Sequence, residues 1–209
     1  MNSITASLAA YLAAASLLTI TPGLDTALVL RMTTGGSPRR ALLAGLGIAT
    51  GCFAWAALVA LGLGALLAAS KLAYTVLRWV GAAYLLYVGY KMLRHPRRVF
   101  LTPAPGEQNH RAAFVTGALT NLLNPKVGVF YVSFLPQFVP AGVSVGPFIL
   151  LLGAIHALLG LIWFTCLIIA TRPISTFLQR PAVVQACDRL TGGVFVAFGL
   201  GLALESRRP

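Results

Sequence analysis

Long runs of apolar residues, separated by short polar stretches, divide the chain into six segments. No run alternates polar and apolar residues, and each is long enough for the roughly 20-residue helix that crosses a bilayer. Because backbone polar groups in lipid must find partners within their own segment, we predict helices and not strands. The predicted fold is therefore an all-α, polytopic membrane protein with six transmembrane helices, over 6–30, 42–69, 72–93, 113–139, 147–170 and 182–204.

The composition points to the same class. Of 209 residues, 58% are hydrophobic and 10% are charged, whereas soluble domains carry about 25% charged residues. This contrast excludes a soluble enzyme with one ordinary core, a disordered chain and a disulfide scaffold. The three cysteines form no CxxC pair and the histidines form no cluster, so we expect neither a metal site nor a cofactor. We predict a single integral membrane domain over residues 1–209.

Positive charge lies mainly between the apolar runs. The chain has 16 Lys and Arg against four Asp and Glu, a balance that in a soluble protein would suggest nucleic acid. Here the positive-inside rule explains it without nucleic acid. We predict that the loops after the first, third and fifth runs are cytoplasmic and that both termini face outward, although Arg207 and Arg208 in the tail oppose this orientation. The cytoplasmic set is Arg31, Arg39, Arg40, Lys91, Arg94, Arg97, Arg98, Arg111, Arg172, Arg180 and Arg189.

The two halves of the chain resemble each other. The third and sixth runs share an Arg-x-x-Gly pattern that begins at Arg78 and Arg189, and the first and fourth runs are each interrupted by a proline, Pro22 and Pro125. Since each half has three spans, an odd number, the second copy must insert upside down. We predict inverted three-helix repeats over 1–93 and 112–209, with the first and fourth helices broken at proline. Such breaks indicate a transporter site at the membrane midplane, although Leu/Ala/Gly-rich helices also align by chance.

The first break carries an acidic residue. Pro22 removes a helical donor and Gly23 adds backbone freedom, so the helix is expected to unwind there. Asp25 then lies at membrane depth, where a carboxylate is expensive and indicates function. It would bind a substrate amine or carry a coupled proton. The alternative is that Asp25 only caps the restarted helix, where a negative charge suits the dipole.

The second break carries amides and a lysine. Asn121 and Asn124 share one helical face, and Asn124 followed by Pro125 has the form of an N-cap and a proline at the first helical position. Lys126 is disfavoured there both by the helix dipole and by lipid. We expect it to need a partner, either an anionic substrate group or Asp25 across the repeat axis. The alternative is that Lys126 snorkels to an interface.

Other polar and small residues within the apolar runs can be explained by structure alone. Gly47 and Gly51 have the spacing that permits tight helix packing. His156 lies in mid-run, where a hydrogen-bonded core residue is more common than a proton relay, and Asp188 is close to arginines that it could balance. The sequence leaves the roles of His156 and Asp188 open.

The motifs together resemble one transporter family. Thr-Pro-Gly-Leu-Asp in the first run, the glycine-rich second run, Arg-x-x-Gly-Ala-Ala-Tyr-Leu in the third and Thr-Asn-Leu-Leu-Asn-Pro-Lys in the fourth are similar to the LysE/RhtB family of amino-acid exporters. The resemblance covers essentially the whole chain, with Leu24 standing where that family commonly has a second proline. It implies proton-driven amino-acid efflux across the bacterial inner membrane. The matching positions are Pro22, Gly23, Asp25, Asn121, Asn124, Pro125 and Lys126.

The resulting hypothesis is an exporter with alternating access and no enzymatic activity. Asp25 would meet the substrate ammonium and carry the proton, and Lys126 would meet the carboxylate, with half-helix N-termini assisting. The expected partners are an amino acid or derivative, the proton and the lipid bilayer, with a homodimer as an assembly to test. The alternatives are an exporter of an inorganic cation or another small solute, a membrane enzyme, and an accessory membrane subunit.

Overall fold

The computed structural model describes residues 3–34, 37–69, 71–96, 109–170, 177 and 180–204, and within these ranges every regular element is helical. Of the residues singled out above, Arg97, Arg98, Arg172, Arg207 and Arg208 lie outside the described part. The elements are α1 (Ser3–Ile20), α2 (Leu24–Thr34), α3 (Pro38–Ala69), α4 (Lys71–Arg94), α5 (His110–Leu122), α6 (Pro125–Val129), the π-helical η1 (Phe130–Phe134), the 3-10 helix η2 (Leu135–Phe138), α7 (Val145–Ile169) and α9 (Pro181–Leu204).

Several of these helices are long and apolar enough to cross a membrane. Among the described residues, three meet this condition alone, over Pro38–Gly62, Val145–Ile169 and Pro181–Gly201. The pair Ile4–Ile20 and Leu24–Thr33 meets it as one span that is bent by 51° at the Pro22 break. The architecture is that of a polytopic helical membrane protein.

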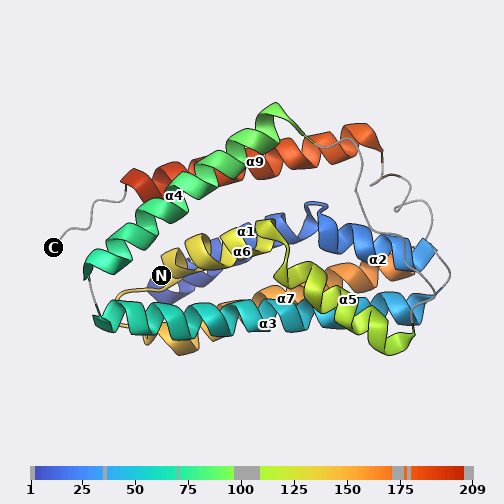
Figure 1. Cartoon of the computed structure of the whole chain (residues 1–209), viewed down its shortest axis with the longest axis horizontal. Helices are drawn as coiled ribbons and strands as arrows, with labels where there is room; N and C mark the ends of the chain where they lie inside the picture. The colour runs from blue at the N-terminus through green and yellow to red at the C-terminus, as the bar shows by residue number, and fades with distance from the viewer. Residues whose placement is uncertain are drawn as a thin grey trace.

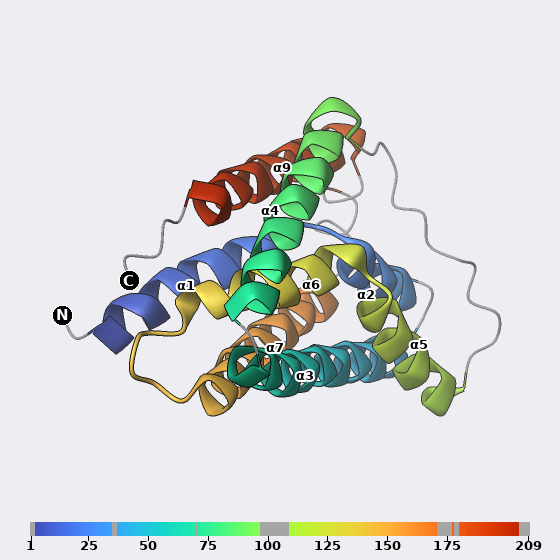
Figure 2. The same ribbon diagram turned by 60° about the vertical axis from the view of Figure 1, so that its left-hand side comes forward.

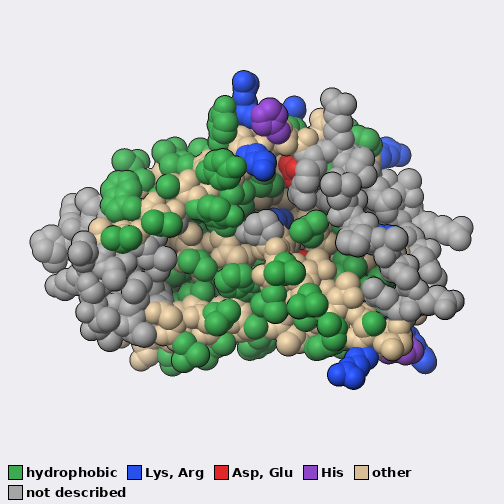
Figure 3. Space-filling model, in the orientation of Figure 1, with side chains coloured by type: hydrophobic (Ala, Val, Ile, Leu, Met, Phe, Trp, Pro, Cys, Tyr) green, Lys and Arg blue, Asp and Glu red, His purple; other side chains and the backbone are tan. Residues whose placement is uncertain are grey.

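Most helices run along the long axis of the molecule, and the two ends of the bundle hold different segments of the chain. In Figure 1 the start of α1 and the end of α9 lie in the left-hand part, whereas α2, α5 and the start of α3 reach the right-hand end. Hydrophobic side chains cover much of the face in Figure 3, and Lys and Arg side chains gather at its top and right. The end of α2 and the start of α5, where the sequence places basic residues, therefore lie away from the start of α1.

The fourth predicted span departs from a regular helix after its break. Leu135 donates its N–H to Phe130 O, five residues back, and a 3-10 turn follows. Pro136 explains the change, because it cannot donate to the carbonyl four residues before it and its ring clashes with that carbonyl. The sequence predicted a break at Pro125 within 113–139, but not this second irregularity.

Close backbone contact joins α3 to α5. A Cβ added to Gly47 would lie 2.0 Å from Phe114 O, and one added to Gly117 would lie 2.1 Å from Ala44 O. The two helices thus cross where both lack side chains, as membrane helices often do. The predicted packing role of Gly47 is confirmed. This crossing fixes the position of the end of α5 along the axis of α3.

Helices α4 and α9 form a second close pair, which lies over the other helices in Figures 1 and 2. A Cβ on Gly192 would lie 2.8 Å from Gly89 O and 3.0 Å from Met92 Cβ. Next to it on α9, Gly193 faces away, and a Cβ there would meet nothing within 4 Å. Adjacent glycines on one helix therefore have opposite environments.

These environments predict opposite effects of the same substitution. Gly192→Ala should lower the free energy of unfolding by about 1–3 kcal/mol, because the added methyl overpacks the crossing with α4. Gly193→Ala should be neutral or slightly stabilising, because alanine favours the helix. Thermal unfolding of both variants in detergent tests this, and equal midpoints would show that the crossing is not tightly packed.

Candidate binding site at the two helix breaks

Pro22 leaves a helix end in the middle of the bundle. It is four residues beyond Leu18 and has no N–H to donate to the Leu18 carbonyl. Thr21 does not compensate, because its N–H and its hydroxyl both donate to Leu17 O, at 3.1 and 2.6 Å. The chain resumes as α2 at Leu24. The break therefore presents backbone carbonyls of α1 that need a donor from another element.

The second break has the form that the sequence predicted. Helix α5 ends at Leu122, and Asn124 has extended backbone and caps the next helix, its Oδ1 accepting from Lys126 N at 3.1 Å. Pro125 opens α6, where its missing N–H leaves no helical bond unmade. The predicted N-cap is confirmed.

The two breaks meet, and the amides of one bind the carboxylate of the other. Asn121 Nδ2 donates to Asp25 Oδ2 at 2.8 Å, and Asn124 Nδ2 donates to Asp25 Oδ1 at 3.3 Å. Asp25 occupies the first turn of α2, where the positive end of the helix dipole favours a negative charge. Asn121 is on α5 and Asn124 is beyond its end, so the two do not share a helical face as predicted, but both amides contact Asp25.

Lys126, at the second break, contacts the backbone of the first break. Its ammonium donates to Leu18 O at 3.1 Å and to Thr21 O at 2.9 Å. These carbonyls form the negative end of α1, which compensates the lysine for its unfavourable position at the start of α6. The ammonium also interacts electrostatically with Asp25. The position of Lys126 in the sequence indicated that it needs a partner, but not that helix-end carbonyls supply it.

Glycines allow the groups to approach. A Cβ on Gly51 would lie 2.6 Å from Asn121 Oδ1, so the bare surface of α3 at this point is what admits the Asn121 side chain. At the first break a Cβ on Gly23 would lie 3.7 Å from Lys126 Nζ, an ordinary contact distance. Gly51 is therefore constrained by space, whereas Gly23 has room for a methyl group.

A small cavity of about 50 Å³ unites the predicted residues. Its lining includes Gly23, Asp25, Asn121, Asn124 and Lys126. Pro22 is buried at the break but does not line the cavity, and the side chain of Pro125 is outside the described part. The volume suffices for a few water molecules and is far below the roughly 300 Å³ of a small ligand site. In this conformation the site is too small to hold an amino acid.

The cavity also includes residues whose role the sequence left open or missed. His156 on α7 lines it, and His156 Nδ1 lies 3.0 Å from the Tyr131 hydroxyl. Cys52 on α3 lines it and accepts from Asn121 Nδ2 at 3.5 Å. A single histidine or cysteine within an apolar run gives no local signal, so only the helix crossings reveal these neighbours.

The buried Tyr131–His156 pair predicts a stability effect. Tyr131→Phe leaves His156 Nδ1 without this partner in apolar surroundings and should lower the free energy of unfolding by about 1–3 kcal/mol. Tyr87→Phe makes the same change on a side chain that is 61% exposed and should have little effect. Thermal unfolding of both variants in detergent measures the difference; a Tyr131→Phe midpoint equal to that of Tyr87→Phe would show that the contact contributes nothing.

Comparison with known proteins gives the chain a family. An uncharacterized membrane protein, YrhP, of Bacillus subtilis is 30% identical, and the match covers 95% of this chain and 99% of that protein. A protein named homoserine/homoserine lactone efflux protein, of Salmonella typhimurium, is 29% identical over 93% of this chain and 94% of its own length. A threonine efflux protein of Escherichia coli is 30% identical over 89% and 92%.

No solved structure matches the chain. Residues 16–206 match the sequence profile of the family described as LysE type translocator. Because this match spans nearly the whole chain, the protein belongs to the LysE type translocators and is a membrane transporter, not an enzyme.

Proposed function

We propose that this protein exports amino acids or close derivatives from the bacterial cytoplasm in exchange for protons. The observation that carries the proposal is the joining of Asp25 and Lys126, one charge of each sign, from two helix breaks into one cavity. A zwitterion needs two such charges in a site that excludes water. Relatives named as homoserine and threonine efflux proteins support this substrate class.

The contacts of Asp25 suggest where the substrate ammonium binds. Asn121 holds Oδ2 at 2.8 Å, whereas Asn124 reaches Oδ1 at the longer distance of 3.3 Å. An ammonium would form a stronger, charge-assisted bond than this amide and would displace Asn124 from Oδ1. The substrate carboxylate would bind the ammonium of Lys126, which already interacts with Asp25 across the cavity.

Proton exchange follows from the use of a single carboxylate. Asp25 can hold a proton or bind a substrate ammonium, but a protonated Asp25 no longer attracts the ammonium. If the carrier reorients only with one of them bound, proton entry drives amino-acid exit. A carboxylate at membrane depth, which accepts hydrogen bonds from two amides of the second break, fits this role.

Alternating access would use the predicted inverted repeats, 1–93 and 112–209, as six spans of the inner membrane. Helix packing favours this symmetry. The second predicted span packs on the fifth (α3 on α7), the third on the sixth (α4 on α9), and the broken first and fourth meet at their breaks. A twofold relation in the membrane plane would generate these pairs. The basic loops would then face the cytoplasm.

The first functional prediction concerns the Asp25 carboxylate. Asp25→Asn keeps the size of the side chain and removes its charge, so gradient-driven export should fall to background while membrane insertion is unchanged. The measurement is efflux of a panel of labelled amino acids from proteoliposomes, with and without an imposed proton gradient. Full export by Asp25→Asn would exclude this mechanism. Failure of the wild type to move any amino acid would favour an inorganic cation or another solute.

The lysine offers a matched comparison. Lys126→Met should lower export of zwitterionic amino acids by at least about tenfold, since a charge-assisted bond contributes roughly 1.5–3 kcal/mol. Lys91→Met makes the same substitution at an exposed end of α4 and should transport normally. Equal rates for the two variants in the same proteoliposome assay would remove Lys126 from the site.

A further inference from the structure

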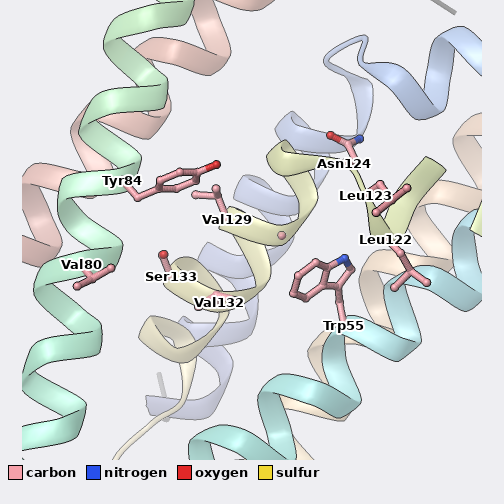
Figure 4. Close-up of a pocket in the computed structure, with 10 residues that line it drawn as sticks. Trp55, Val80, Tyr84, Leu122, Leu123, Asn124, Val129, Val132 and Ser133 are labelled. Carbon is pink, nitrogen blue, oxygen red and sulfur yellow. The ribbon is translucent and has the colours of Figure 1, made fainter. Parts of the chain in front are cut away.

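A second, larger cavity lies beside the small cavity that contains Asp25 and Lys126. It has a volume of about 330 Å³ and lies between α4, α3 and the α6–η1 segment. Figure 4 shows Tyr84 and Val80 entering from α4, Trp55 from α3 and Ser133 from η1. Most of its wall is apolar. The volume is at the lower end of small-molecule sites, which suits part of a small ligand better than a large one.

Asn124 is a wall of both cavities. The lining of the small cavity with Asp25 and that of the large cavity both include it. Its amide reaches Asp25 Oδ1 by the 3.3 Å hydrogen bond described above. If the amide leaves that oxygen, the side chain no longer separates the charged groups from the apolar space. A ligand bound at Asp25 would then extend past Asn124 into the large cavity.

Trp55 brings an unsatisfied donor to this cavity. Its indole Nε1 is buried and has no hydrogen-bond partner among the described residues. Figure 4 shows the nitrogen turned toward the end of the cavity where Asn124, Leu122 and Leu123 lie. A buried donor without a partner is costly. Gly128 leaves space for the ring, since a Cβ there would lie 3.0 Å from Trp55 Cζ2.

We propose that the large cavity binds the side chain of the exported amino acid and that Trp55 Nε1 donates to an acceptor on that side chain. The proposal rests on the proposed function, in which Asp25 and Lys126 hold the charged groups. Because the indole nitrogen lies near the Asn124 end, the acceptor would be close to the α-carbon, as in a β-hydroxyl group. The favoured substrate class is amino acids with an apolar side chain that carries an oxygen near its base. A lipid tail in the cavity would leave the indole without a partner, because hydrocarbon offers no acceptor.

The size of the cavity is tested by filling it. Val80→Trp places a large ring at the mouth of the cavity from an exposed position on α4, and Val76→Trp adds the same ring one turn earlier, outside the lining; the two valines are 61% and 54% exposed. In proteoliposomes Val80→Trp should raise the half-saturating concentration for leucine and valine by about tenfold or more, the range for apolar side-chain contacts. Alanine transport should change less than about twofold. Val76→Trp should behave as wild type.

The indole is tested with an isosteric substrate pair. Threonine and valine have nearly the same shape, and only threonine has a β-hydroxyl. Trp55→Phe should lower the preference for threonine over valine by about two- to tenfold, the effect of one hydrogen bond. Trp163→Phe removes another buried indole N–H without a described partner, on α7 outside both cavities, and should leave the preference unchanged.

The outcomes separate this inference from the proposed function. Export of amino acids by the wild type, with Val80→Trp affecting alanine as much as leucine or affecting neither, would overturn the side-chain cavity and leave the exporter intact. An unchanged threonine preference in Trp55→Phe would overturn the role of the indole. Absence of amino-acid export in the wild type would overturn the proposed function itself.

Discussion

The structure depends on satisfying backbone and charged groups at two helix breaks inside an apolar bundle. Water is scarce there, so each exposed carbonyl, carboxylate or ammonium must find a protein partner. The breaks satisfy each other. Lys126 donates to carbonyls at the end of α1, and Asn121 and Asn124 donate to Asp25. Loss of either break would leave the polar groups of the other without partners.

The polar groups of the two breaks can reach each other only because glycines leave space between the helices. Asn121 approaches Asp25 only because Gly51 leaves its side of α3 bare, and the α3–α5 crossing is set by Gly47 and Gly117. In lipid, apolar side chains gain little by leaving one apolar environment for another, so close backbone contact and polar bonds drive helix association. The glycines and the polar cluster therefore act together. The glycines let the helices approach closely, and the hydrogen bonds of the polar cluster fix how far along one another they sit.

One residue, Asn124, takes part in several of these contacts at once. Asn124 serves three purposes, since it caps α6, contacts Asp25 and separates a small polar cavity from a large apolar one. A ligand that replaces one of these contacts alters the others. In the proposed mechanism, binding at Asp25 would therefore affect the wall of the neighbouring cavity and the start of α6.

The sequence by itself determined the membrane class, the apolar runs, the proline breaks and the Asn124 cap, because these depend on hydropathy and on backbone groups a few residues apart. It also identified Asp25 and Lys126, since charges in apolar runs are conspicuous. Only the tertiary structure decided that Lys126 binds helix-end carbonyls, that His156 joins the cavity and that Trp55 borders a second one. Those facts depend on contacts between different helices, such as that of Lys126 with Leu18, 108 positions away. There the geometry of helix crossing, and not local pattern, decides which side chains meet.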